Sequence, residues 1–211
     1  MTSPNVAPDV EQVLEHNRRQ WVRHVIGRIV LGLAWIALPF VMHAVGIPDT
    51  FFTALPFLVG FYVLLFLLIR TSRGRRIAAC ERVLRTYPLE YHTRVVKKHE
   101  QWLLLGTVFT VKVSTRGQHG APLMRAINAS TVRRWPKGAE DRGAWVAGDL
   151  PFGGVMIVPD TNDMLFMQPA DWQKFADERE QADAPRSGRA QQAGLTQLVE
   201  REPNITHFYA G

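Results

Sequence analysis

Histidines are the residues of this chain with the most versatile chemistry, because a neutral imidazole can act as a general base or bind a metal. Seven occur: His16, His24, His43, His92, His99, His119 and His207. No two have the i, i+4 spacing that places two metal ligands on one helix face, and no cysteine pair accompanies them. We therefore predict no metal site and no cofactor. His43, near the outer end of an apolar run, either has a functional role in a membrane or reaches interfacial water.

The single cysteine, Cys80, is a second candidate. Arg75, Arg76 and Arg82 lie near it in the sequence and could lower the pKa of its thiol, as in a nucleophilic cysteine. No matching base can be identified, so we interpret Cys80 as a small buried residue of a helix. A lone cysteine cannot form an internal disulfide, which agrees with a reducing cytoplasmic compartment.

Three loops contain residues that are typical of ligand sites. In 147–155, AGDLPFGGV, glycines could approach a ligand, but the pattern of a phosphate loop is absent and Asp149 suits a turn. In 159–163, PDTND, side-chain oxygens could hold Ca²⁺, but the downstream Gly and Glu of a calcium loop are missing. Both segments predict hairpin turns. In 133–138, RRWPKG, the mixture suits an anionic headgroup or an exposed turn, and we expect no nucleic acid as a partner.

No catalytic signature emerges from these residues. We predict a non-enzymatic protein, an anchor or interaction module without catalytic, cofactor-binding or metal-binding residues. One alternative is a membrane-bound enzyme of unrecognised type, with Asp149, His92 or His119 in a pocket of a β domain. Another is an accessory subunit of a larger membrane complex. A structure that brings two of the three residues together would favour the enzyme.

Basic residues are concentrated in the middle of the chain. Residues 70–150 carry sixteen Lys and Arg against six Asp and Glu, a net charge of +10. Residues 151–211 carry five against nine, a net charge of −4. A basic residue near an anionic membrane surface gains about 1 kcal/mol. We predict contacts with anionic lipid headgroups for five arginines: Arg70, Arg73, Arg75, Arg76 and Arg134.

Two apolar runs precede this basic region. No charged residue occurs from Ile29 to Pro48 or from Thr50 to Ile69. About twenty residues of helix span roughly 30 Å, the thickness of the hydrocarbon core of a bilayer. We predict a transmembrane hairpin; the alternative, a buried hairpin of a soluble protein, needs a larger core than the rest of the chain supplies. The first run is too long for a signal peptide and has no cleavage site after it.

Arginines at the ends of the runs predict the orientation. They flank both runs on one side, whereas the connecting GIPDT has no Lys or Arg. The positive-inside rule then places both termini in the cytoplasm. We predict a multi-pass protein of the plasma membrane, whose partners are the bilayer, anionic headgroups and a membrane or cytoplasmic protein.

The chain divides into four segments. Residues 1–24 form a cytoplasmic segment whose helix, from Asp9, lies on the membrane surface or continues into the first span. Residues 25–70 hold the spans, at about 27–47 and 50–70. Residues 71–180 form a cytoplasmic domain, in which a helix over 72–87 precedes short alternating strands and a closing helix from Asp171. Residues 181–211 form a flexible tail.

The predicted fold class is therefore α+β: an N-terminal transmembrane helical hairpin followed by a small antiparallel β barrel or sandwich with flanking helices. Within that domain, WLLLGTVF at 102–109 is interpreted as the buried start of one long strand.

The stretch WVAGDLPFGGVMIVPDTNDMLFMQPADW, at 145–172, resembles uncharacterised small two-span integral membrane proteins of actinobacteria. CERVLRTYP at 80–88 and the RRWPKG turn are similar to the same group, so the resemblance covers roughly residues 75–180. It implies no catalytic residues. A looser likeness, of layout only, exists to bacterial membrane proteins that join two spans to a pleckstrin-homology-like domain, a strongly bent sheet closed by a C-terminal helix.

Overall fold

The computed structural model describes residues 6–46, 51–69, 72–103, 106–114, 122–129 and 134–196. Three long helices come first: α1 (Val10–Ala44), α2 (Phe51–Ile69) and α3 (Ser72–Thr86). Seven strands and four short helices follow: β1 (Leu89–His92), β2 (Arg94–Leu103), β3 (Gly106–Ser114), β4 (Leu123–Asn128), α4 (Ala139–Arg142), β5 (Ala144–Asp149), β6 (Gly153–Val158), β7 (Asp163–Pro169), η1 (Gln173–Phe175), α5 (Ala176–Glu180) and α6 (Ala184–Gln192).

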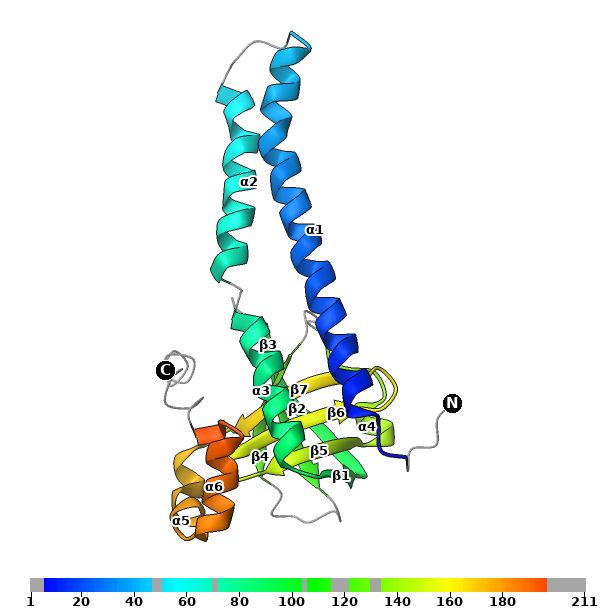
Figure 1. The fold of residues 1–211 in the computed structure, drawn as a ribbon, viewed down its shortest axis with the longest axis vertical. Coiled ribbons are helices and arrows are strands. Elements are labelled where there is room, and N and C mark those ends of the chain that lie inside the picture. The colour runs from blue at the N-terminus through cyan, green and yellow to red at the C-terminus, as the bar shows by residue number, and fades with distance from the viewer. Residues whose placement is uncertain are drawn as a thin grey trace.

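Helices α1 and α2 form an antiparallel pair that projects away from the sheet (Figure 1). Glycines let the two backbones approach each other. A Cβ atom on Gly60 would lie 2.6 Å from the carbonyl oxygen of Gly32, and one on Gly32 would lie 2.7 Å from the Leu64 side chain. Such close approach at small residues is typical of packed membrane helices. α1 continues through Pro39 without a break.

In the described part of the chain, α1 is the one helix that is long and apolar enough to cross a membrane. The apolar part of α2, Ala54–Leu67, is shorter. The structure thus gives one candidate span where the sequence predicts two.

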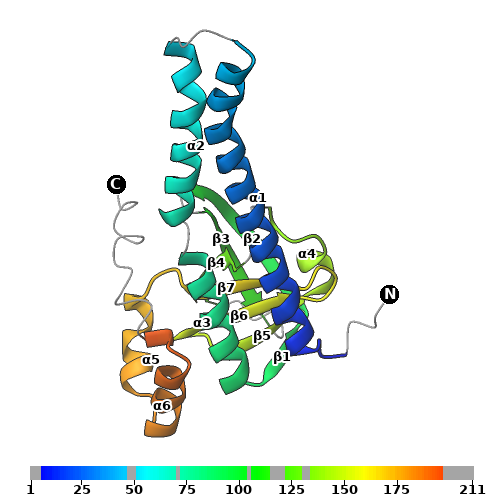
Figure 2. The ribbon, with the colours of Figure 1, turned by 45° about the horizontal axis from the view of Figure 1, so that its top comes forward.

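The seven strands form one antiparallel sheet in the order β1-β5-β6-β7-β4-β3-β2. The edge strands β1 and β2 are separated in the sequence by Thr93 alone, so the sheet must curl to bring its two edges together (Figures 1 and 2). α4 lies against β2, where the Glu140 carboxylate accepts a hydrogen bond from the Lys97 backbone N–H at 2.9 Å. The result is a half-barrel.

Both faces of the central strands are buried. Inside the curl, Phe109, Met156 and Leu165 belong to one apolar core. On the outer face, Ile157 and Met164 belong to a second core, which also includes residues of α1, α3 and α6. Figure 2 shows α1 and α3 in front of this outer face. Burial on both sides explains why β6 reads GGVMIV rather than an alternation of apolar and polar residues.

The prediction of an α+β fold with a small antiparallel β domain and flanking helices is confirmed, with a half-barrel in place of a closed barrel or a sandwich. The interpretation of 102–109 as one strand is wrong. β2 and β3 are the two arms of a hairpin, in which Leu103 pairs with Gly106. Gly106 therefore begins the return strand.

The predictions for the two ends of the chain have different outcomes. At the N-terminal end, α1 is continuous from Val10 into the apolar run, which agrees with the second of the two alternatives for this helix. Its first turns bury Val13 and Leu14 against the sheet domain, which the sequence did not predict. At the other end, the flexible tail predicted from residue 181 is wrong for 184–196. α6 forms there, capped by Asp183, and Ala190 and Leu195 are fully buried. The remainder of the predicted tail, 197–211, lies outside the described residues.

Candidate functional site

The junction between α1 and the sheet is built around one buried amide, here termed the Asn17 clasp. The side-chain nitrogen of Asn17 donates hydrogen bonds to the carbonyl oxygens of Val13 at 2.8 Å and Asn162 at 2.7 Å. Its side-chain oxygen accepts from the backbone N–H of Met164 at 3.4 Å. Asn17 is 0 % exposed, so these bonds replace water entirely. The clasp therefore fixes the rotation and height of α1 on the β6–β7 hairpin.

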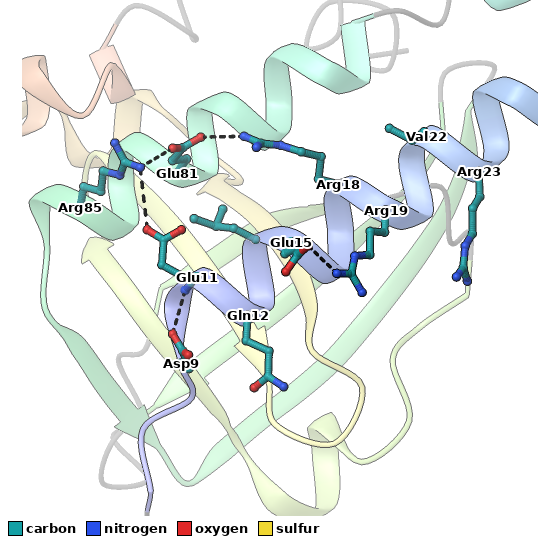
Figure 3. A pocket seen from close by; sticks show the side chains of 11 residues that line it. Asp9, Glu11, Gln12, Glu15, Arg18, Arg19, Val22, Arg23, Glu81 and Arg85 are labelled. Atoms are coloured by element: carbon teal, nitrogen blue, oxygen red, sulfur yellow. Dashed lines mark hydrogen bonds and ion pairs between the residues drawn. The ribbon is translucent and has the colours of Figure 1, made fainter.

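A charged groove of about 1100 Å³ lies on one side of this junction, between α1 and α3 (Figure 3). Glu81 of α3 is its central residue: the carboxylate lies 2.7 Å from the Arg85 guanidinium on the same helix and 3.6 Å from that of Arg18 on α1. Arg85 also lies 3.8 Å from the Glu11 carboxylate. These ion pairs link the two helices across the groove.

The groove pairs contribute little free energy individually. The side chains of Arg18, Arg85 and Glu11 are 64 % exposed or more, whereas that of Glu81 is 22 % exposed. Exposed ion pairs are typically worth about 0–1 kcal/mol and are screened by salt. The groove is therefore a charged surface suited to binding, not a water-excluded catalytic centre.

A smaller pocket of about 380 Å³ also borders α1, beside the β6–β7 turn. It is lined by Gln12, Glu15, His16, Arg19, Gln20, Arg23 and Asn162. The Nε2 atoms of His16 and Gln20 lie 2.7 Å apart, within hydrogen-bond distance. The Arg19 guanidinium lies 2.5 Å from the Glu15 carboxylate, and the buried Gln20 Oε1 has no partner among the described residues.

Asp163 places a buried carboxyl group next to the clasp. It is 5 % exposed and begins β7, one residue after Asn162. Burial raises the pKa of Asp163, which its hydrogen bond with Thr161 and the nearby His16 oppose only in part. Burial thus disfavours the ionised form of this carboxyl group within an otherwise well-bonded junction.

The five arginines predicted to contact lipid have different outcomes. Arg75 and Arg134 are exposed, as lipid contact requires. Arg76 is buried, at 9 % exposed, so little of its side chain is available to a lipid headgroup. Arg70 and the Arg73 side chain lie outside the described residues.

The prediction that Cys80 is a small buried helix residue is confirmed. It is 0 % exposed, and burial raises the pKa of its thiol to about 12, outweighing the opposing charge of Arg76. The two predicted hairpin turns are confirmed as well. Asp149 ends β5, where its carboxylate accepts two hydrogen bonds from Arg186 of α6, at 2.5 Å and 2.7 Å. The second turn, 159–163, connects β6 to β7.

The residues of the alternative enzyme site do not come together in the described structure. His92 pairs with Ala144 at the start of β5, whereas Asp149 ends that strand. His92 is buried, and burial lowers its pKa, but its Nδ1 atom has no hydrogen-bond partner among the described residues, whereas the imidazole of a general base is normally oriented by one. His119 lies outside the described residues. Within the described part of the chain, no three His, Cys, Asp or Glu side chains gather to hold a metal ion.

The sequence analysis missed the Asn17 clasp and the α1 pocket. A signal for the clasp was present, because Asn17 falls at helical spacing among Val10, Val13, Leu14 and Trp21. A polar residue within such an apolar stripe needs a buried partner. The partners, Asn162 and Met164, lie about 145 positions away in the sequence, so the spacing alone could not identify them.

Models of known protein families, curated proteins and solved structures were all compared with this chain, and none of them matches it.

Proposed function

We propose that this chain is an integral protein of the plasma membrane, anchored by α1 and α2 as two spans, with both termini in the cytoplasm. Its half-barrel acts there as a non-enzymatic interaction module, which presents a protein partner or anionic lipid with a surface held close to the bilayer. The proposal includes a relationship to the two-span actinobacterial membrane proteins that the 75–180 segment resembles.

The observation that carries the proposal is the apolar surface of the helix pair. Phe40 is 68 % exposed, Phe61 58 % and Tyr62 64 %, and most of the exposed large apolar side chains among the described residues lie on α1 and α2. The most apolar stretch of 18 residues in α1 is only 6 % buried, whereas the core helix of a soluble protein would be mostly buried. A patch of this extent needs to be covered, and lipid is the solvent that suits it.

The length of α2 is compatible with a second span. Its 19 residues extend over about 28 Å as helix, close to the roughly 30 Å of hydrocarbon in a bilayer. α2 also runs antiparallel to α1 and packs on it at Gly32 and Gly60. If α2 crosses the bilayer beside α1, its backbone N–H and C=O groups are hydrogen-bonded within the helix, as the hydrocarbon core requires.

The interaction role rests on what the described domain offers. Its buried carboxyl and thiol groups are not paired as acid and base, while the groove between α1 and α3 presents charged side chains that water can reach. The exposed Arg75 and Arg134 add positive charge for anionic headgroups. A surface of this kind favours recognition over turnover.

Cysteine accessibility in intact cells tests the anchoring. Two single-cysteine variants would be made in a C80A background: V45C, at the exposed end of α1, and Q181C, on the exposed end of α5. A maleimide that cannot cross membranes should label V45C in intact cells and Q181C only after permeabilisation. Labelling of Q181C alone in intact cells would invert the orientation, and recovery of the chain in the soluble fraction would refute the anchor.

The interaction role would be tested next, by purifying the full chain in mild detergent and quantifying what accompanies it. A stoichiometric protein, or retained anionic lipid that R75Q/R134Q loses and R94Q/R189Q keeps, is the expected result. The matched control removes the same charge from two other exposed positions. A turnover that a single polar substitution in the half-barrel abolishes would favour the enzyme instead.

A further inference from the structure

We propose that the face of α1 formed by His16, Arg19, Gln20 and Arg23 binds the phosphate group of a phosphorylated cytoplasmic solute. The site is the pocket beside the β6–β7 turn, whose lining residues on α1 extend from Gln12 past Asn17 to Arg23, below the membrane-spanning part of the helix. Its cytoplasmic location rests on the proposed function, whereas its chemistry rests on the described side chains.

The spacing of the four residues places them in a single stripe along one face of α1. Positions 16, 19, 20 and 23 are separated by three, one and three residues, so all four project from one side of the helix. The pocket that they line, of about 380 Å³, lies in the range of volumes that small-molecule sites occupy. A rigid helix thus presents two guanidinium groups, an imidazole and an amide to one cavity.

The charge balance of the pocket favours an anion. Arg19 and Arg23 contribute two positive charges to the lining, and Glu15 contributes one negative charge. Arg23 has no ion-pair partner among the described residues, and Figure 3 shows its side chain directed away from Glu81. The Glu15–Arg19 pair is 60 % and 68 % exposed, so a phosphate dianion can recruit Arg19 at little cost. Guanidinium groups bind phosphate oxygens through paired hydrogen bonds.

Hydrogen-bonding capacity is left over in the pocket. The His16 and Gln20 side chains bond to each other, and one buried amide atom of Gln20 has no partner among the described residues. If the amide is turned over, His16 Nε2–H donates to the Gln20 oxygen and the amide NH₂ becomes the unpartnered group. In that arrangement the pocket offers a buried donor, which is what a phosphate oxygen accepts.

The depth of these four residues below the bilayer distinguishes a lipid headgroup from a dissolved ligand as the source of the phosphate. Measured along the helix from Ile29, where the uncharged run starts, Arg23 lies about 9 Å below the hydrocarbon and His16 about 20 Å below it. The headgroup layer of one leaflet is about 5–8 Å thick. The phosphate of an ordinary diacyl lipid therefore reaches Arg23 at most, whereas a dissolved phosphate ligand reaches the entire stripe.

A binding measurement on the full chain tests the site. Wild type, R19Q/R23Q and the matched control R94Q/R189Q would be reconstituted into nanodiscs of zwitterionic lipid and titrated with pyrophosphate in a chloride buffer. A second arm would use nanodiscs with anionic phospholipid and no added phosphate. Thermal unfolding of each chain, followed through its tryptophan fluorescence, reports binding as a rise of the midpoint.

The expected result is a midpoint that rises with pyrophosphate in wild type and in R94Q/R189Q, with at least about tenfold weaker apparent affinity in R19Q/R23Q. Stabilisation by anionic lipid alone, lost in R19Q/R23Q, would overturn the solute and assign the arginines to headgroups. No stabilisation of wild type in either arm, or an equal loss in both variants, would overturn the site itself. Because incorporation into nanodiscs is scored separately, failure of the site is distinguishable from failure of the membrane anchor.

Discussion

Replacing Asn17 by leucine should loosen the attachment of α1 to the sheet without changing the volume of the junction greatly. Leucine cannot donate to the Asn162 carbonyl, which accepts at 2.7 Å, or accept from the Met164 N–H, which donates at 3.4 Å. An orphaned buried polar group costs about 1–3 kcal/mol. The long Met164 bond adds less, so we expect a loss of about 2–4 kcal/mol in the free energy that holds α1 on the β6–β7 hairpin.

Amide hydrogen exchange of the full chain in detergent measures this loss where it occurs. Since about 1.4 kcal/mol corresponds to a factor of ten, exchange of the Met164 amide should accelerate by about 30-fold to several hundredfold in N17L. The control is Q12L, which makes the same polar-to-apolar change at an exposed position of α1. If Met164 exchange changes less than about threefold, or if Q12L has an equal effect, the clasp does not hold the junction.

Three further predictions concern single residues. G60V should lower the free energy of unfolding in detergent by about 1–3 kcal/mol, because the new Cβ atom would lie 2.6 Å from the Gly32 carbonyl oxygen. G27V is the control and should not lower it, because a Cβ atom at Gly27 would meet nothing within 4 Å. Equal effects of the two substitutions would contradict the packing of α2 on α1. Cys80, fully buried and with its pKa raised to about 12, should resist a maleimide at pH 7 until the chain is unfolded, and rapid labelling of the native chain would contradict its burial. Burial raises the folded-state pKa of Asp163 above its unfolded value of 3.8, so its favourable contribution is complete below pH 3.8 and is lost as the pH rises through the folded pKa. D163N should therefore unfold at a higher temperature than wild type at pH 7, with the difference vanishing near pH 3; a D163N chain less stable at pH 7 would refute this sign.

Local patterns in the sequence were sufficient for the class of the fold and for most of its elements. Alternation and turn residues identified the strands around Asp149 and the 159–163 turn, because hairpin chemistry is local. The same local logic failed at 102–109, where the apolar residues concealed the change from β2, which ends at Leu103, to β3, which begins at Gly106. Apolar periodicity cannot distinguish one long strand from two that pair with each other.

The site could not be predicted for a different reason. The apolar face at the start of α1 was recognised, and a membrane surface and a continuous span were its predicted settings. Packing on the sheet was missed, because a membrane surface and a protein core favour the same apolar side chains. Only the fold brings Asn162 to Asn17 and Glu81 to Arg18, across separations that spacing does not encode. Likewise Arg76 and Arg75 are neighbours in sequence, yet the packing of α3 buries the first and exposes the second.

The continuity of α1 has a mechanical consequence. A 35-residue helix is about 52 Å long, and about 40 Å separate Asn17 from Ala44. With its far end held, a tilt of about 10° would displace Asn17 by about 7 Å, a distance comparable to one turn of helix. If α1 spans a bilayer, as proposed, a change in bilayer thickness that tilts it would move the entire half-barrel sideways, because the half-barrel is attached to α1 at the β6–β7 hairpin.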